Sequence, residues 1–142
     1  MPRHEFAAAF AALVQAHLAR PFQWGVHDCV TFAAAAVRLA TGQDPLAGLA
    51  VAWGDRQRAA ALLRAQGGLR RAVQRALQPL AEPVPPGFAG VGDVVLAADP
   101  FAPRRRLLLA VCNGAHLLAP GRAGLAALPL AAGVQAWRLR HG

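Results

Sequence analysis

The stretch "PFQWGVHDCVTFAAAAVRLATG", residues 21–42, places a cysteine where a polar segment turns into an alanine-rich one. Asp28 is a residue type that caps helix N-termini, and Gly42 supplies the left-handed backbone that commonly ends a helix. Together they predict a helix from about Cys29 to Thr41. Its four consecutive alanines leave little side-chain bulk, so this helix can approach a sheet or another helix closely.

The segments on either side of this helix also have helical patterns. Upstream, apolar residues recur at helical spacing over residues 4–20, which predicts an amphipathic first helix. Downstream, residues 54–68 predict a third helix capped by Asp55, and residues 70–78 predict a short fourth helix. The proline- and glycine-rich residues 81–92 predict a connector without regular structure.

Short apolar runs in the last third of the chain predict strands, which begin at Asp93, Leu107, His116 and Val134. Between the second and third runs, Asn113-Gly114 is a strong signal for a two-residue hairpin turn. Such a turn places Cys112 opposite Ala115 and leaves Cys112 and His116 on opposite faces of the hairpin.

Helices first and strands second predict an α+β fold, in which the N-terminal helices pack on a small antiparallel sheet. The chain has 142 residues, 56% of them hydrophobic, which is ample for one domain with its own core. We expect a single domain over residues 1–142. It is mainly helical over residues 1–80 and mainly strands over residues 93–142, with the connector of residues 81–92 between them.

The formal net charge of +8 comes entirely from arginine, since the chain contains no lysine. This pattern is typical of a GC-rich coding sequence. The arginines are scattered without aromatic interleaving or a known reading motif, so we expect no specific nucleic-acid partner. No apolar run reaches the ~20 residues of a membrane-spanning helix, so no membrane span is expected. We also expect no cofactor.

Cys29 stands in the predicted first turn of a helix, where unpaired backbone N–H groups and the helix dipole favour a thiolate. The same N–H groups can stabilise an oxyanion that develops on a substrate carbonyl. These features predict a nucleophile. The alternative is a small buried cysteine with a purely structural role.

The order of motifs along the chain resembles the NlpC-type papain-like cell-wall peptidases. It is more similar to a small branch of that fold found among tail-tip and tail-assembly proteins of phages and prophages. The matching residues are Phe22, Trp24, Gly25, Asp28, Cys29, Phe32, Thr41, Gly42, Asp44, Pro45, Gly92 and Asp93, with a weaker match around Trp137. The resemblance implies a papain-like fold with Cys29 as the nucleophile at the start of a helix packed on an antiparallel sheet.

The resemblance also implies a catalytic histidine near Leu107 to Leu109, where this sequence has none. A cysteine peptidase without this base loses the group that takes the thiol proton and protonates the leaving amine. His116 is the candidate substitute, although it lies about four strand residues, or roughly 13 Å, from Leu107. It can act only if Cys29 meets the turn end of the hairpin, and is otherwise a half-exposed strand histidine.

Three residues near Cys29 are candidates for substrate binding. Trp24 either packs in the core or stacks on sugar or peptide in a groove. His27 is a solvated loop side chain, a charge that assists the thiolate, or a metal ligand. For Asp28 we favour the role of a helix cap over that of the third member of a catalytic triad, because the helix N–H groups need its carboxylate.

Zinc is a further alternative, since His27, Cys29, Cys112 and His116 are suitable ligand types. The predicted hairpin points Cys112 and His116 to opposite faces, so we expect no metal site.

By this resemblance we expect a phage or prophage tail-tip or tail-assembly protein, assembled in the bacterial cytoplasm and then part of the virion. Its partners are other tail-tip proteins and, where the site still acts, peptidoglycan. The missing histidine favours a structural protein with degenerate or weak catalysis, a pseudoenzyme. The alternative is an active cysteine endopeptidase that cleaves peptidoglycan stem peptides while the phage genome is delivered. The enzyme assignment therefore stays open.

Overall fold

The computed structural model of the chain describes residues 1–47, 53–100 and 106–142. Within these three segments the chain is α+β, with four α-helices and one six-stranded antiparallel sheet. The elements are α1 Arg3–His17, α2 Cys29–Thr41, α3 Arg56–Ala65, α4 Leu69–Leu77, β1 Ala81–Val84, β2 Val94–Ala98, β3 Leu107–Cys112, β4 Leu117–Gly121, β5 Gly124–Leu128 and β6 Gly133–Leu139, with short 3-10 helices at Pro86–Phe88 and Leu130–Ala132.

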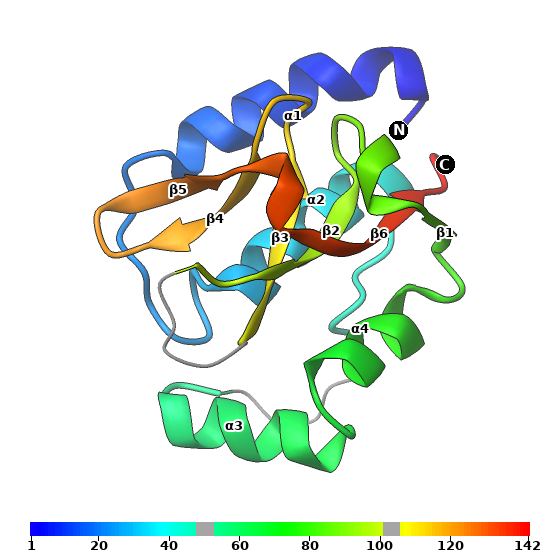
Figure 1. Cartoon of the computed structure of the whole chain (residues 1–142). Coiled ribbons are helices and arrows are strands. Elements are labelled where there is room, and N and C mark those ends of the chain that lie inside the picture. The colour runs from blue at the N-terminus through cyan, green and yellow to red at the C-terminus, as the bar shows by residue number, and fades with distance from the viewer. Residues whose placement is uncertain (48–52, 101–105) are drawn as a thin grey trace.

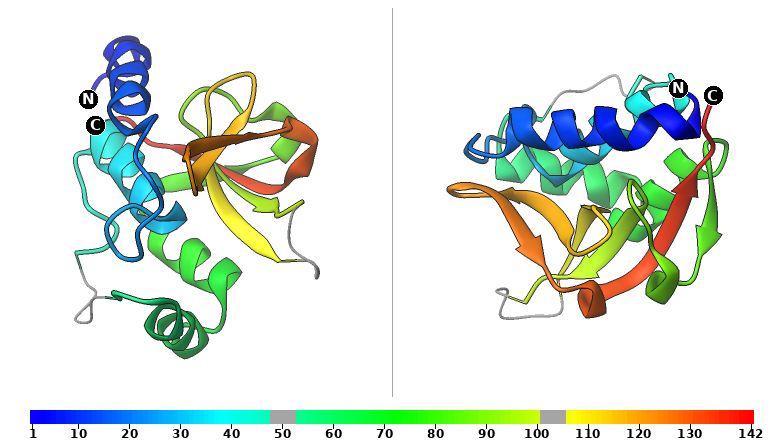
Figure 2. Two further views of the ribbon diagram at one scale, coloured as in Figure 1. Left: turned by 90° about the vertical axis from the view of Figure 1, so that its left-hand side faces the viewer. Right: turned by 90° about the horizontal axis from the view of Figure 1, so that it is seen from above.

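The strands lie in the order β1-β6-β2-β3-β4-β5, and every neighbouring pair is antiparallel. Helices α1 and α2 lie side by side on one face of this sheet, while α3 and α4 form a separate pair near the start of α2 (Figures 1 and 2). The predicted class, helices packed on an antiparallel sheet, is therefore confirmed.

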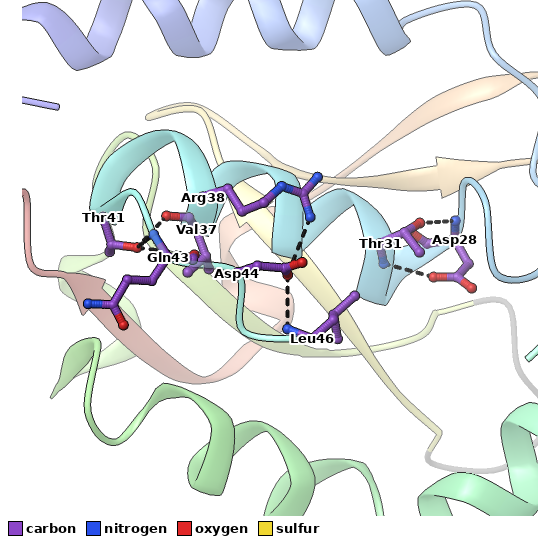
Figure 3. A network of polar contacts seen from close by, with 8 residues as sticks. All are labelled: Asp28, Thr31, Val37, Arg38, Thr41, Gln43, Asp44 and Leu46. Atoms are coloured by element: carbon purple, nitrogen blue, oxygen red, sulfur yellow. Dashed lines mark hydrogen bonds and ion pairs between the residues drawn. The ribbon is translucent and has the colours of Figure 1, made fainter. Parts of the chain in front are cut away.

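Helix α2 begins and ends where the sequence predicts, because both signals act through local hydrogen bonds. Oδ1 of Asp28 accepts a hydrogen bond from the Thr31 N–H at 2.9 Å, and the Thr31 hydroxyl accepts one from the Asp28 N–H at 2.8 Å (Figure 3). This reciprocal pair satisfies two backbone donors at the helix start. At the other end Gly42 adopts φ 76°, the left-handed conformation expected of it.

The alanine face of α2 packs against the sheet, as predicted. Ala33, Ala36 and Ala40 are buried in one cluster with Leu96 of β2 and Val111 of β3. Small side chains let the helix axis approach the strands closely. Burial of a leucine such as Leu96, which is fully covered, contributes roughly 1.5–3 kcal/mol.

Two of the strands, β1 and β5, were not predicted from the sequence. The expected irregular connector at residues 81–92 contains β1, which pairs with β6, and the unpredicted β5 pairs with β4. Pro83 is tolerated in β1 because, among the described strands, this one lies at the sheet edge beside β6. The prediction of an irregular connector was wrong because a partner far along the chain supplies the hydrogen bonds.

The predicted hairpin register was also wrong. Cys112 pairs with Leu117 instead of Ala115, and the turn contains residues 113–116. It is closed by the Asn113 N–H, which donates to the His116 carbonyl at 3.0 Å. The Asn113 side-chain oxygen accepts hydrogen bonds from the N–H groups of Ala115 and His116. Asn113 does not adopt the positive φ that a two-residue type I′ turn requires, so its side chain closes a longer turn instead.

Candidate functional site

A cavity of about 660 Å³ lies between α2, the α3–α4 pair and β3. Its walls are mainly apolar, with Cys29 at the start of α2 and Leu107 and Leu109 on β3. Trp24 and Trp53, from the segments that precede α2 and α3, complete the wall near Cys29. Helices α2, α3 and α4 and strand β3 thus form the walls of the cavity that holds the candidate nucleophile.

The pKa of Cys29 is raised, which favours the protonated thiol. Burial raises its pKa to about 11, the backbone of Leu109 opposes this rise by hydrogen bonding, and the Asp28 carboxylate adds to it. The N–H groups of Cys29 and Val30 at the helix start lower the pKa by less than burial raises it. The N–H groups at the helix start thus favour the thiolate, as expected, but burial of the sulfur has a larger and opposite effect on the pKa of Cys29.

In the described segments no histidine lines this cavity. Leu107 and Leu109 occupy the positions where the sequence resemblance implies the histidine, and Leu109 approaches Cys29 through its backbone. His116 is exposed in the β3–β4 turn and is not among the residues that line the cavity. The structure therefore does not bring His116 to Cys29.

Asp28 is buried, with only 2% of its surface exposed, and its carboxylate is occupied by three N–H donors. Besides the cap to Thr31, its Oδ2 accepts hydrogen bonds from the Gly25 N–H at 2.9 Å and from the Trp53 indole at 2.6 Å. These bonds hold the segment before α2 and the Trp53 ring at the cavity wall. Asp28 is thus a cap that also holds the cavity wall in place, and within the described part of the chain no imidazole is hydrogen-bonded to its carboxylate.

Trp24 lines the cavity and contacts Phe22 edge-to-face, with ring centroids 4.8 Å apart. The sequence reasoning named Trp24 and missed Trp53, together with Arg56 and Arg75, which α3 and α4 bring to the same cavity. No motif marks these residues. They reach the site only because the α3–α4 pair packs beside the start of α2.

His27 lies apart from Cys29, on the side of α2 that faces α1. Its ring stacks on that of His17, with centroids 5.2 Å apart, and it lines a second, smaller cavity. His27 and Cys29 are two positions apart in the sequence, but their side chains line different cavities.

Cys112 is fully buried in a cluster on the other face of the sheet, with Val95, Ala110 and Leu117. Cys29 packs against the main cluster on the α2 face, and both cysteines are free thiols. Among the described residues no group of three or more His, Cys, Asp or Glu side chains could hold a metal ion.

Asp93, the acidic residue of the Gly-Asp pair in the resemblance, is also structural. It is buried, accepts a hydrogen bond from the Gly90 N–H at 2.8 Å and forms an ion pair of 3.0 Å with Arg138 of β6. These contacts join the start of β2 to its neighbour in the sheet.

The described helices are all too short or too polar to cross a membrane. A family model described as "Domain of unknown function (DUF6950)" matches residues 1–139. No curated protein and no solved structure matches the chain.

Proposed function

Since the chain belongs to the DUF6950 family, whose function is unknown, we propose its function from the site itself. The chain is a papain-like domain of a phage or prophage tail tip that no longer turns over peptides. Its cavity has a binding or structural role among other tail-tip proteins in the virion.

The observation that carries the proposal is the surroundings of the Cys29 sulfur. Cys29 stands at the start of a helix packed on an antiparallel sheet and faces β3, the arrangement that the sequence resemblance implies for a thiol peptidase. Leucines line the cavity where a base is needed, and the raised pKa of Cys29 keeps the thiol protonated. A thiol without a proton acceptor cannot attack a peptide carbonyl efficiently.

The first test is turnover. Purified protein incubated with peptidoglycan stem peptides should release no fragments detectable by mass spectrometry. Release that Cys29→Ser abolishes would contradict the loss of turnover and support the alternative endopeptidase. His116→Ala would then show whether that histidine acts as the base.

The second test restores an imidazole. Leu107→His and Leu109→His place a histidine on the cavity side of β3, and Leu108→His is the matched control because Leu108 packs against the cluster on the opposite face. At least one of the two cavity variants should alkylate at Cys29 faster than the control at pH 7.5. Equal rates in all three would contradict the likeness between this cavity and a thiol-peptidase site.

The location in a virion is tested separately. Virions purified after induction of a prophage that encodes the chain should contain it, as detected by mass spectrometry and by antibody labelling of the tail tip. Absence from the particles would contradict the tail-tip assignment whatever the outcome of the thiol experiments.

A further inference from the structure

A second cavity, of about 350 Å³, lies on the side of α2 that faces α1. Its polar lining residues are His17 at the end of α1, Arg20 and His27 in the following segment, and Thr31 and Arg38 on α2. Among the described residues it shares only Leu46 with the Cys29 cavity, because α2 separates the two. It is therefore a distinct site that the proposed function does not use.

The lining of this second cavity is cationic. It contains two arginines and two histidines, and none of its described lining residues is acidic. Arg38 forms an exposed ion pair with Asp44 at 3.4 Å, which solvent weakens (Figure 3). A metal cation would be repelled by the two guanidinium groups, whereas an anion would be attracted.

His27 is the second observation that points to a ligand. Its side chain is 2% exposed and lines the cavity, yet its Nε2 atom has no hydrogen-bond partner. Buried polar atoms are normally paired, because an unpaired one costs about 1–3 kcal/mol. By contrast, Nδ1 of the neighbouring His17 is hydrogen-bonded to the Leu13 carbonyl at 2.8 Å.

The charges around His27 explain how it would respond to an anion. Burial lowers its pKa most, His17 and Arg20 lower it further, and Asp28 on the far side raises it. Arg38 of α2 adds positive charge to the same cavity. His27 is thus neutral at neutral pH, and a bound anion would favour its protonated form.

We propose that this cavity binds a phosphate-type dianion, held by Arg20 and Arg38, with His27 taking up a proton as it binds. Guanidinium groups suit phosphoryl oxygens through paired, charge-assisted hydrogen bonds. Two arginines and a protonated imidazole together carry enough positive charge for a dianionic ligand, whereas a ligand with a single carboxylate carries only one negative charge. The volume leaves room for a small organic group, so a phosphomonoester and free phosphate share the required chemistry.

The test is a titration of the whole chain with inorganic phosphate, followed by NMR of the histidine ring signals. His17 and His27 should shift saturably, while the exposed His4 serves as an internal reference. Sulfate is the second probe, because it stays a dianion between pH 6 and 7.5 whereas phosphate itself titrates. Its affinity should rise severalfold from pH 7.5 to pH 6, since binding is linked to protonation of an imidazole.

Arg20→Gln and Arg38→Gln should each weaken phosphate binding by at least about tenfold. Arg58→Gln is the matched control, because Arg58 lies on α3, is 72% exposed and lines neither cavity. It should bind within about twofold of the wild type. Absence of saturable shifts, or equal weakening in all three variants, would overturn the proposal.

Glycerol phosphate distinguishes the two sources of the anion. Tighter binding than inorganic phosphate supports a phosphomonoester ligand, and equal or weaker binding supports free phosphate. If neither glycerol phosphate nor inorganic phosphate moves the His17 and His27 signals, the site does not exist.

Discussion

The reactivity of Cys29 towards iodoacetamide tests the balance between burial and the helix start. The pKa of this thiol rises from 9.0 to about 11 in the folded chain. A rise of two units leaves about 100-fold less thiolate at any pH well below both values. The thiolate is the nucleophile, but a thiolate of higher pKa is intrinsically more reactive, so alkylation at pH 7.5 should be slower than that of an unperturbed thiol by about tenfold.

The chain suits this measurement, since it contains no lysine and no tyrosine. Between pH 8.5 and 11 the cysteines are therefore the only side chains expected to titrate. Labelling at each cysteine is followed by mass spectrometry from pH 7 to 11, with Cys29→Ser to identify the modified peptide. Protein in denaturant supplies the rate of the unprotected thiols.

In the folded protein the Cys29 rate should climb about tenfold per pH unit, without a plateau up to about pH 10. Cys112 should label more slowly still, because it is fully buried and its pKa is also raised by burial. A plateau at Cys29 below pH 8.5 would refute the reasoning. It would mean that the N–H groups at the helix start outweigh burial and that the thiol is activated.

Four further results are expected. Asp28→Ala should lower the free energy of unfolding in urea by about 2 kcal/mol or more, because three N–H donors lose their acceptor. An unchanged free energy of unfolding would show that the Asp28 carboxylate does not hold these segments in place. Gly92→Ala should lower the free energy of unfolding by about 2–4 kcal/mol, because the added Cβ would overlap the Phe6 ring and because the backbone φ of +85° disfavours alanine. A wild-type Tm in calorimetry would contradict this. The free energy of unfolding should be greatest above pH 6.5 and should decline as the pH falls below it. Burial lowers the pKa of His27 and of His141, so below pH 6.5 the unfolded chain takes up protons on these two imidazoles more readily than the folded chain. Urea titrations that coincide at pH 7.5 and 5.5 would exclude this linkage. Binding to duplex DNA should be weak and fall steeply with added salt, and sequence-preferring binding at physiological salt in a gel-shift assay would overturn the codon-usage explanation of the arginines.

The features that the sequence determined by itself are those built from local interactions. Asp28 caps the helix three residues ahead of Thr31, and Gly42 ends it by adopting a backbone conformation open to glycine, so the ends of α2 follow from neighbouring residues. The start of α3 follows for the same reason, since the Asp55 carboxylate accepts a hydrogen bond from the Arg58 N–H. In β6, Ala136 and Trp137 lie in clusters on opposite faces of the sheet, because successive strand residues face opposite sides.

Tertiary structure alone decided the features that depend on partners distant in sequence. Strand β1 exists because β6 lies beside it, and its proline-rich sequence carries no strand signal of its own. Helices α3 and α4 form walls of the cavity that Cys29 lines, and burial of the sulfur raises the pKa that the helix start alone would lower. Likewise, His17 and His27 meet only because α1 packs on α2. Hydrogen bonds between residues a few positions apart can be predicted from the sequence. The burial of a side chain and the electric field at it depend on all the residues around it, and only the fold brings those residues together.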